Sequence, residues 1–125
     1  MEAEQSLFEK LGGKPAVELA VDKFYEELLQ DSRVSHFFDG IDMEKQRRHQ
    51  KAFLTVAFGG VNNYNGRNMR KAHERLVAES GLNDEHFDII VGKLAGVLLE
   101  LGVAQELVEQ VGAVAESVRR DVLNR

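Results

Sequence analysis

Residues 58–76 read FGGVNNYNGRNMRKAHERL, and this stretch decides how the chain is organised. Its first half is rich in glycine and asparagine, which are typical of loops. Its second half changes to a helical pattern in which His73 lies beside the apolar residues Met69 and Leu76, because side chains three and four positions apart share one face of a helix. The stretch therefore raises the question of why the chain holds His73 at the end of so loose a connection.

Helical patterns also cover most of the chain on both sides of this stretch. Apolar residues recur three and four positions apart, and no useful length alternates with the period of two that marks a strand. We predict helices at 6–11, from Pro15 to 28, at 43–58, at 69–77, at 84–101 and at 107–122, with a turn at 32–38 and a loop at 59–68. The pattern predicts an all-α fold, a single domain over residues 1–125, whose two long C-terminal helices pack antiparallel.

Particular residues predict where these helices begin and end. Asp42 and Asn83 have side chains favoured at helix N-caps, and Gly81 can take the left-handed conformation that ends a helix. Pro15 is suitable as the first residue of a helix, where its missing N–H is harmless. Gly92 and Gly96 each weaken a helix by about 1 kcal/mol, so we expect a close helix crossing to compensate for them.

Composition excludes several classes of function. The formal net charge is −5, from 16 Lys and Arg against 21 Asp and Glu, whereas nucleic-acid binding usually needs a basic face. The chain has no cysteine, which removes disulfides, thiolate catalysis and haem attachment through Cys-x-x-Cys-His. The first residues, MEAEQSLFEK, show no secretory signal, and no segment approaches the roughly 20 apolar residues that span a bilayer. We therefore expect a cytoplasmic protein.

Polar side chains occupy positions that the helical pattern assigns to the core. Buried without partners, they would destabilise the fold. Each has an ordinary explanation when taken alone: a hydrogen-bonded core histidine, a pair of glutamines at a solvated edge, an amphipathic tyrosine. Together they favour a ligand that the core surrounds, and they are Tyr25, Gln46, His49, Gln50 and His73. His36 and His86 are expected at the surface.

The pattern of histidines favours haem over other metal sites. Helical di-iron proteins use Glu-x-x-His pairs, but no glutamate stands three residues before any histidine of this chain, and the His-Glu-x-x-His zinc motif is also missing. Haem needs only one neutral imidazole on one side of the iron and polar donors on the other. An anionic porphyrin would also attract basic residues at its rim, for which the candidates are Lys45, Arg48, Arg67 and Arg70.

The chain resembles the group I truncated haemoglobins of the cyanobacterial and algal type over nearly its whole length. The matching pieces are LFEKLGG (7–13), AVDKFYEELLQD (20–31), HFFDGIDMEKQRRHQKAFL (36–54), AFGGVNNYNGRNMRKAHERL (57–76) and GLNDEHFD (81–88). The Phe-Gly-Gly, the Tyr-x-Gly-Arg-x-Met and the Ala-His form a specific set. The resemblance implies a two-over-two helical sandwich around haem b. The proximal helix would be reduced to a turn or so, and an extended glycine-bearing loop would let it reach the iron.

The same resemblance implies a role for each candidate residue. His73 would be the proximal iron ligand, and His49 matches a position that in some members binds iron as a second axial ligand. Tyr25, Gln46 and Gln50 would form the distal polar cluster. The other residues expected at the haem are Phe37 or Phe38 on the porphyrin, then Lys45, Phe53, Tyr64, Arg67, Met69 and Leu76. Cyanobacterial members can bond haem covalently through a histidine near the C-terminus, but no histidine follows His86, so we expect non-covalent haem.

The resemblance also implies reversible binding of O2, CO and NO. Donors from Tyr25 and a glutamine would act as charge-assisted hydrogen bonds worth about 1.5–3 kcal/mol each, and slow oxygen release makes a poor carrier. We expect nitric oxide dioxygenation with an external reductase, in a monomer without nucleic-acid or membrane partners. Oxygen storage or sensing without catalysis is the alternative, and a haem-free helical interaction module is the third hypothesis.

Overall fold

The computed structural model describes residues 6–59 and 66–125, and within these ranges the chain forms helices and no strand. The all-α prediction is therefore confirmed. The elements in chain order are α1 (Leu7–Lys10), α2 (Gly13–Gln30), the 3-10 turn η1 (Ser35–Phe38), α3 (Met43–Gly59), α4 (Gly66–Ser80), α5 (Asp84–Glu100), α6 (Gln105–Ser117) and α7 (Arg119–Val122). None of the described helices is long and apolar enough to cross a membrane.

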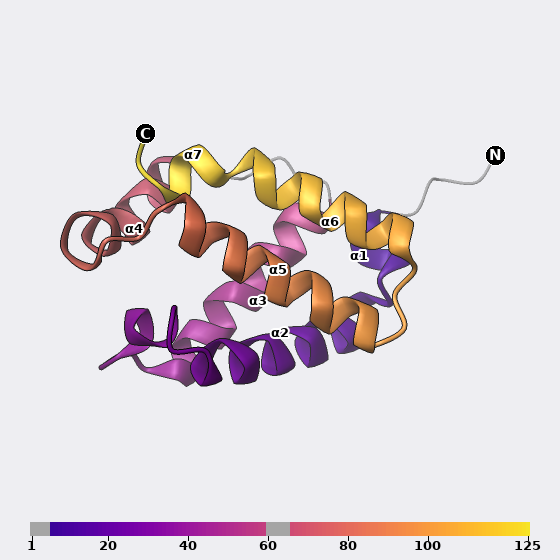
Figure 1. The fold of residues 1–125 in the computed structure, drawn as a ribbon. Coiled ribbons are helices and arrows are strands. Elements are labelled where there is room, and N and C mark those ends of the chain that lie inside the picture. The colour runs from indigo at the N-terminus through magenta and orange to yellow at the C-terminus, as the bar shows by residue number, and fades with distance from the viewer. Residues whose placement is uncertain (1–5, 60–65) are drawn as a thin grey trace.

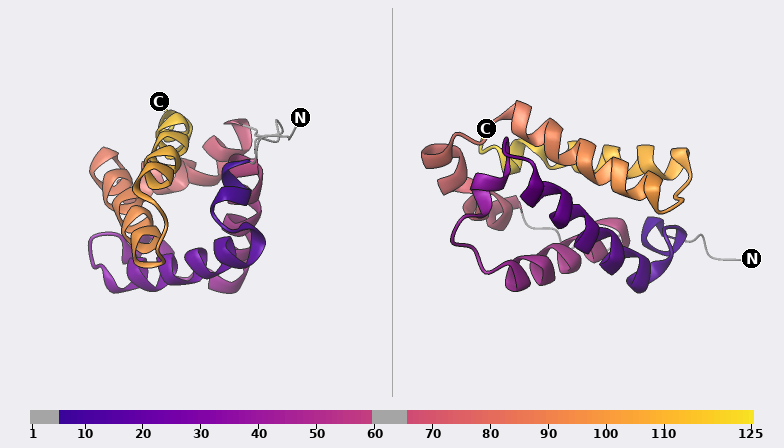
Figure 2. Two further views of the ribbon diagram at one scale, coloured as in Figure 1. Left: turned by 90° about the vertical axis from the view of Figure 1, so that its right-hand side faces the viewer. Right: turned by 60° about the horizontal axis from the view of Figure 1, so that its bottom comes forward.

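Two pairs of long helices form the body of the molecule. Helix α2 packs on α3 in one pair, and α5 runs antiparallel to α6 in the other (Figure 1). Helix α2 also packs on α5, which joins the two pairs around a core that includes Val21, Phe24, Leu94 and Val97. Figure 2 shows α4 and α7 together at one end of this body and α1 at the other. The two antiparallel C-terminal helices are thus as the sequence predicts.

Glycines and a serine set the start of the chain's first helices. The Ser6 hydroxyl caps α1 by accepting a hydrogen bond from the Glu9 N–H at 3.2 Å. Gly12 follows with a φ of +113°, and a Cβ there would lie 2.8 Å from the Cβ of Ala16. Only glycine fits this turn. Helix α2 begins at Gly13, so Pro15 is its third residue instead of its first, still within the first turn, where an N–H has no partner in the helix.

The junction between α4 and α5 is built as the sequence predicts. Gly81 has a left-handed φ of +74°, and the Leu82 N–H donates to the Leu76 carbonyl oxygen, six positions earlier, at 3.0 Å. The Asn83 side chain then accepts from the His86 N–H, while the His86 ring accepts from the Asn83 N–H, both at 3.2 Å. His86 is therefore half-buried in a reciprocal cap, whereas we predicted a surface residue.

Three predictions about the helices are wrong. Gly92 and Gly96 are exposed, and a Cβ at either would meet open space, so no described helix crosses closely at them. The last helix is interrupted at Val118, whose φ of −107° and ψ of 0° lie outside the helical region. Helix α4 has 15 residues and is not reduced to one turn. It begins at Gly66, so residues 66–68 of the predicted loop are helical, and residues 60–65 lie outside the described ranges.

Candidate functional site

His73 lies in the second turn of α4, half-buried, with its ring fixed by the helix itself. Its Nδ1 atom is 2.9 Å from the carbonyl oxygen of Met69, one turn earlier. A carbonyl can only accept, so Nδ1 carries the proton and Nε2 presents its lone pair. Burial lowers the pKa of His73, and the bond to Met69 opposes this shift. The imidazole is therefore neutral at pH 7, oriented, and ready to bind a metal through Nε2.

Helix α4 is only partly covered by the rest of the protein. None of its described side chains is fully buried. Met69 and His73 are half-buried, as are Leu76 and Val77, which pack against the edge of the core. Ala72, directly before His73, is exposed. The inner face of α4 thus lacks the apolar cover that a 15-residue amphipathic helix usually has.

Tyr25 and Gln46 meet between α2 and α3. The Tyr25 side chain is 2% exposed, and the Gln46 amide Nε2 donates to its hydroxyl oxygen at 3.3 Å. Because the oxygen accepts this bond, the Tyr25 O–H remains able to donate to a further group. Burial raises the pKa of Tyr25, against the opposing effects of the Gln46 bond and the Arg47 charge. The phenol therefore keeps its proton at neutral pH and acts as a donor.

The two neighbouring phenylalanines of η1 lie in different surroundings. The Phe38 ring packs edge-on to Tyr25, with centroids 5.7 Å apart and an interplanar angle of 88°. Phe37 is buried and packs instead against His36 at 4.1 Å and His86 at 5.0 Å. Of the two, Phe38 is therefore the one beside the Tyr25–Gln46 pair.

Helix α3 presents a polar stripe whose members differ in exposure. Gln46 and Gln50, one turn apart, are half-buried, and so is Phe53. His49 is exposed, as are the basic residues that flank it, Lys45 and Arg48. The His49 ring is therefore not covered by the rest of the described chain.

Arg47 was missed by the sequence reasoning although it adjoins Gln46. Its Nε atom is buried without a hydrogen bond to any described residue, and it lies 4.0 Å from Oδ1 of Asp22, which also pairs with Lys51 at 3.3 Å. Its charge acts on the Tyr25 hydroxyl, whose pKa it lowers. Arg47 and Lys51 are one helical turn apart, and both lie opposite Asp22 on α2. Their spacing is the signal from which this pairing could have been predicted.

The remaining candidate residues do not come together as a set of metal ligands. Arg70 donates to Asp121 and to the main-chain oxygen of Arg125, so its guanidinium faces the C-terminal segment. Tyr64 and the side chain of Arg67 lie outside what the structure describes. The described residues contain no group of three or more histidine, cysteine, aspartate or glutamate side chains that could hold a metal ion.

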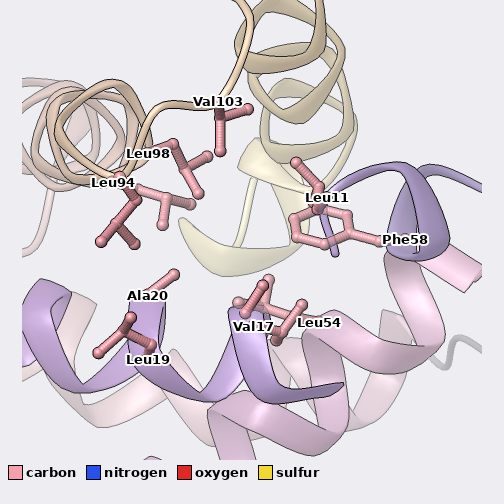
Figure 3. A pocket seen from close by; sticks show the side chains of 11 residues that line it. Leu11, Val17, Leu19, Ala20, Leu54, Phe58, Leu94, Leu98 and Val103 are labelled. Atoms are coloured by element: carbon pink, nitrogen blue, oxygen red, sulfur yellow. The ribbon is translucent and has the colours of Figure 1, made fainter. Parts of the chain in front are cut away.

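A separate apolar cavity of about 130 Å³ lies among the helices (Figure 3). Its walls come from the α1–α2 junction, α2, α3 and α5, and they include Leu11, Val17, Leu54, Phe58 and Leu98. Every lining side chain is hydrocarbon, and neither Tyr25 nor His73 is among them. The cavity has no group for chemistry and could hold only a small apolar molecule.

Comparisons with known proteins agree with this arrangement. The sequence profile of the bacterial-like globin family matches residues 6–124. The chain is 57% identical over 122 residues to the group 1 truncated hemoglobin GlbN of Synechocystis sp., covering 96% of this chain and 98% of that protein. It is 42% identical over 125 residues to the group 1 truncated hemoglobin of Tetrahymena pyriformis, covering 100% of both.

Solved structures show the same likeness. The 2/2 hemoglobin of Synechococcus sp. PCC 7002, in the cyanomet state with covalently attached heme, superposes with a TM-score of 0.90 at 52% identity, over 96% of this chain and 99% of that one. The Fe(III) form of the truncated hemoglobin of Tetrahymena pyriformis superposes with a TM-score of 0.84 at 43% identity, over 95% of this chain and 98% of that one.

Proposed function

The chain belongs to the bacterial-like globins, as a group 1 truncated haemoglobin with the two-over-two fold, and on that premise we propose how it holds haem and what it does with it. Membership of this family implies gas binding by haem. We propose that the haem is of the b type and non-covalently bound, because the chain has no cysteine and no histidine after His86. The observation that carries the proposal is the His73 ring, fixed at Nδ1 and open at Nε2.

The residues present fit this group. His73 supplies one neutral nitrogen ligand, and no competing cluster of metal ligands exists among the described residues. The inner face of α4 lacks full cover, and a buried tyrosine–glutamine pair lies on the α2–α3 side. When bound, haem supplies an iron centre that takes up oxygen, carbon monoxide and nitric oxide and can change oxidation state.

We assign the residues around the group as follows. His73 binds the iron through Nε2, and Phe38, next to Tyr25, packs on the porphyrin in preference to Phe37. Exposed Lys45 is free to approach a propionate at the rim. The remaining proposed contacts are Phe53, Tyr64, Arg67, Met69 and Leu76.

Tyr25, Gln46 and Gln50 control the gas ligand in this proposal. Gln46 donates to the Tyr25 oxygen and so directs the phenol proton away from itself. Each charge-assisted hydrogen bond to a ligand that carries negative charge is worth about 1.5–3 kcal/mol, and every 1.4 kcal/mol slows release about tenfold. Two such donors hold oxygen too long for a carrier and favour its use as a reactant, so we propose nitric oxide dioxygenation with an external reductase.

His49 is proposed as a second, displaceable ligand of the iron. It is exposed in this structure, three residues from Gln46 on α3, so its ring is not held by the core. The apparent affinity for gases then falls by the fraction of molecules in which the site is open. Oxygen storage or sensing is the competing function, and the expected cytoplasmic location and monomeric state are further parts of the proposal.

The test is an optical spectrum of the haem-loaded protein, ferric, then reduced with dithionite, then exposed to carbon monoxide. Split low-spin bands that yield slowly to the carbonyl spectrum support His49 and His73 as joint ligands. A high-spin reduced form that binds carbon monoxide at once supports His73 alone. Loss of the oxygenated spectrum on adding nitric oxide, with nitrate formed and turnover under a reductase, separates dioxygenation from storage, and failure to retain haem would refute the proposal.

A further inference from the structure

Helix α4 is tied to the end of the chain by a set of polar contacts that we call the C-terminal clamp: Arg70, Asp121, Asn124 and Arg125. The Arg70 guanidinium donates from Nε to Oδ1 of Asp121 at 2.8 Å and from Nη2 to the main-chain oxygen of Arg125 at 2.8 Å. The Asn124 amide donates in return to the main-chain oxygen of Arg70 at 3.0 Å. Side chain and backbone of one residue on α4 are therefore both held.

The clamp is connected to the hydrophobic core and to helix α5. Leu123, between the clamp residues, is 5% exposed and belongs to the core. The Arg125 side chain contacts Asp84 at the start of α5. Arg119 donates to Asp84 at 3.0 Å and lies over the Phe87 ring at 4.5 Å. Through these contacts α7 connects the first turns of α4 to the first turn of α5.

Backbone strain is concentrated at the same place. Asn124 is the non-glycine residue with positive φ in the described ranges, at +57°. Asparagine tolerates this left-handed conformation better than most residues, but the conformation still has an energetic cost. It turns the chain so that the Asn124 amide reaches the Arg70 carbonyl, and the clamp contacts offset the cost.

The clamp acts on the turn that orients His73. Arg70 directly follows Met69, whose carbonyl accepts from the His73 ring, so the two carbonyls belong to one helical turn. No described side chain of α4 is fully buried, so apolar packing alone holds this turn poorly. We propose that the C-terminal clamp positions His73 against the iron and sets how slowly the protein releases haem, an inference that rests on the proposed function.

The experiment compares Arg70→Gln with Arg75→Gln as a matched control. Arg75 is on the same helix and, among the described residues, pairs with Glu79 alone at 3.3 Å, with both side chains exposed. Haem transfer from each holoprotein to excess apomyoglobin gives the release rate. We expect Arg70→Gln to release haem about tenfold faster, equivalent to about 1.4 kcal/mol, and Arg75→Gln to stay within about twofold of the parent.

A spectroscopic readout separates positioning from general loosening. The iron–histidine stretching band of the ferrous protein, recorded by resonance Raman in a His49→Leu background, reports the geometry of the His73 bond. We expect it to shift or broaden in Arg70→Gln and in Asp121→Asn, to remain unchanged in Arg75→Gln, and to be partly restored in Arg70→Lys. If Arg70→Gln loses its helical circular dichroism, the variant has lost its fold. The comparison of release rate and band then uses Asp121→Asn, which keeps the shape of the side chain.

The outcomes distinguish this inference from the function it rests on. Parental release rates and an unchanged band in both clamp variants would overturn the clamp and leave haem binding by His73 intact. A parent protein that takes up no haem, or a His73→Ala variant that keeps the band, would overturn both.

Discussion

Replacing Tyr25 with phenylalanine removes one buried oxygen atom and leaves the ring in place. The ring keeps its packing against Phe24 at 5.3 Å and Phe38 at 5.7 Å. What disappears is the acceptor for the Gln46 amide at 3.3 Å and the O–H donor. The variant therefore isolates the polar contribution of a residue that is otherwise part of the core.

The expected effects on stability and on ligand release differ in size. A neutral hydrogen bond contributes about 0.5–1.5 kcal/mol to stability, and the bond to Gln46 is long, so the free energy of unfolding should fall by at most about 1 kcal/mol. A charge-assisted bond to the gas ligand is worth about 1.5–3 kcal/mol, so oxygen release should be roughly 10- to 150-fold faster.

Stopped-flow mixing of the oxygenated ferrous protein with carbon monoxide measures this release rate. Carbon monoxide carries little negative charge on the iron and serves as the internal control, so its own release should change less than about threefold for a lost hydrogen bond. Because the Gln46 amide donates to the Tyr25 oxygen, Gln46→Leu should accelerate oxygen release less than Tyr25→Phe, and the double variant should match Tyr25→Phe.

Two results would refute this reasoning. Oxygen release from Tyr25→Phe within about twofold of the parent would mean that the phenol does not donate to the ligand. Equal acceleration of oxygen and carbon monoxide would mean that the substitution merely opens the site.

Three further variants or conditions test the rest of the site. His73→Ala should lose stable iron ligation and its histidine–iron band, unless His49 takes over; an unchanged optical spectrum would remove His73 from the iron. His49→Leu should convert a six-coordinate resting protein into one with an open or water-bound iron, read from the visible spectrum, and no change would remove His49 from the site. Burial lowers the pKa of His73 below its ordinary 6.5, so the unfolded chain binds this proton more readily than the folded one, and the stability of the haem-free protein should fall as pH drops below 6.5. Urea unfolding between about pH 8 and about pH 5 measures this fall, which should be smaller in His73→Leu.

The helices were predictable because each carries its signal locally. Apolar spacing marks α2, α3, α5 and α6, and the caps at Asn83 and Gly81 depend on side chains or backbone freedom that can be read at a single position. Tyr25 and Gln46 were expected to need a partner because each is a polar residue on an apolar face. The partner predicted from the sequence was a bound ligand, whereas in the structure the two side chains bond to each other.

The features that the sequence did not predict depend on contacts between distant residues or on the rotation of a helix about its axis. The stripe of Gln46, His49 and Gln50 covers a wide arc of the helix, and spacing alone does not tell which of the three is exposed. In the structure His49 is exposed and the two glutamines are half-buried. Glycines in a helix are compatible with close packing or with exposure, and Gly92 is exposed. The contact between Arg70 and Asp121 spans 51 positions, and nothing local to either residue predicts it.

That span has a consequence for how the protein is made. Arg70 and Asp121 are separated by 51 residues, and ribosomes add roughly 5–20 residues per second. Helix α4 therefore leaves the ribosome roughly 3–10 seconds before the segment that holds it. During this interval α2 and α3 can already pair, whereas α4 has neither its clamp nor helix α7 to pack against. The histidine-bearing helix of the nascent chain thus acquires its final position only after residues 121–125 have been synthesised.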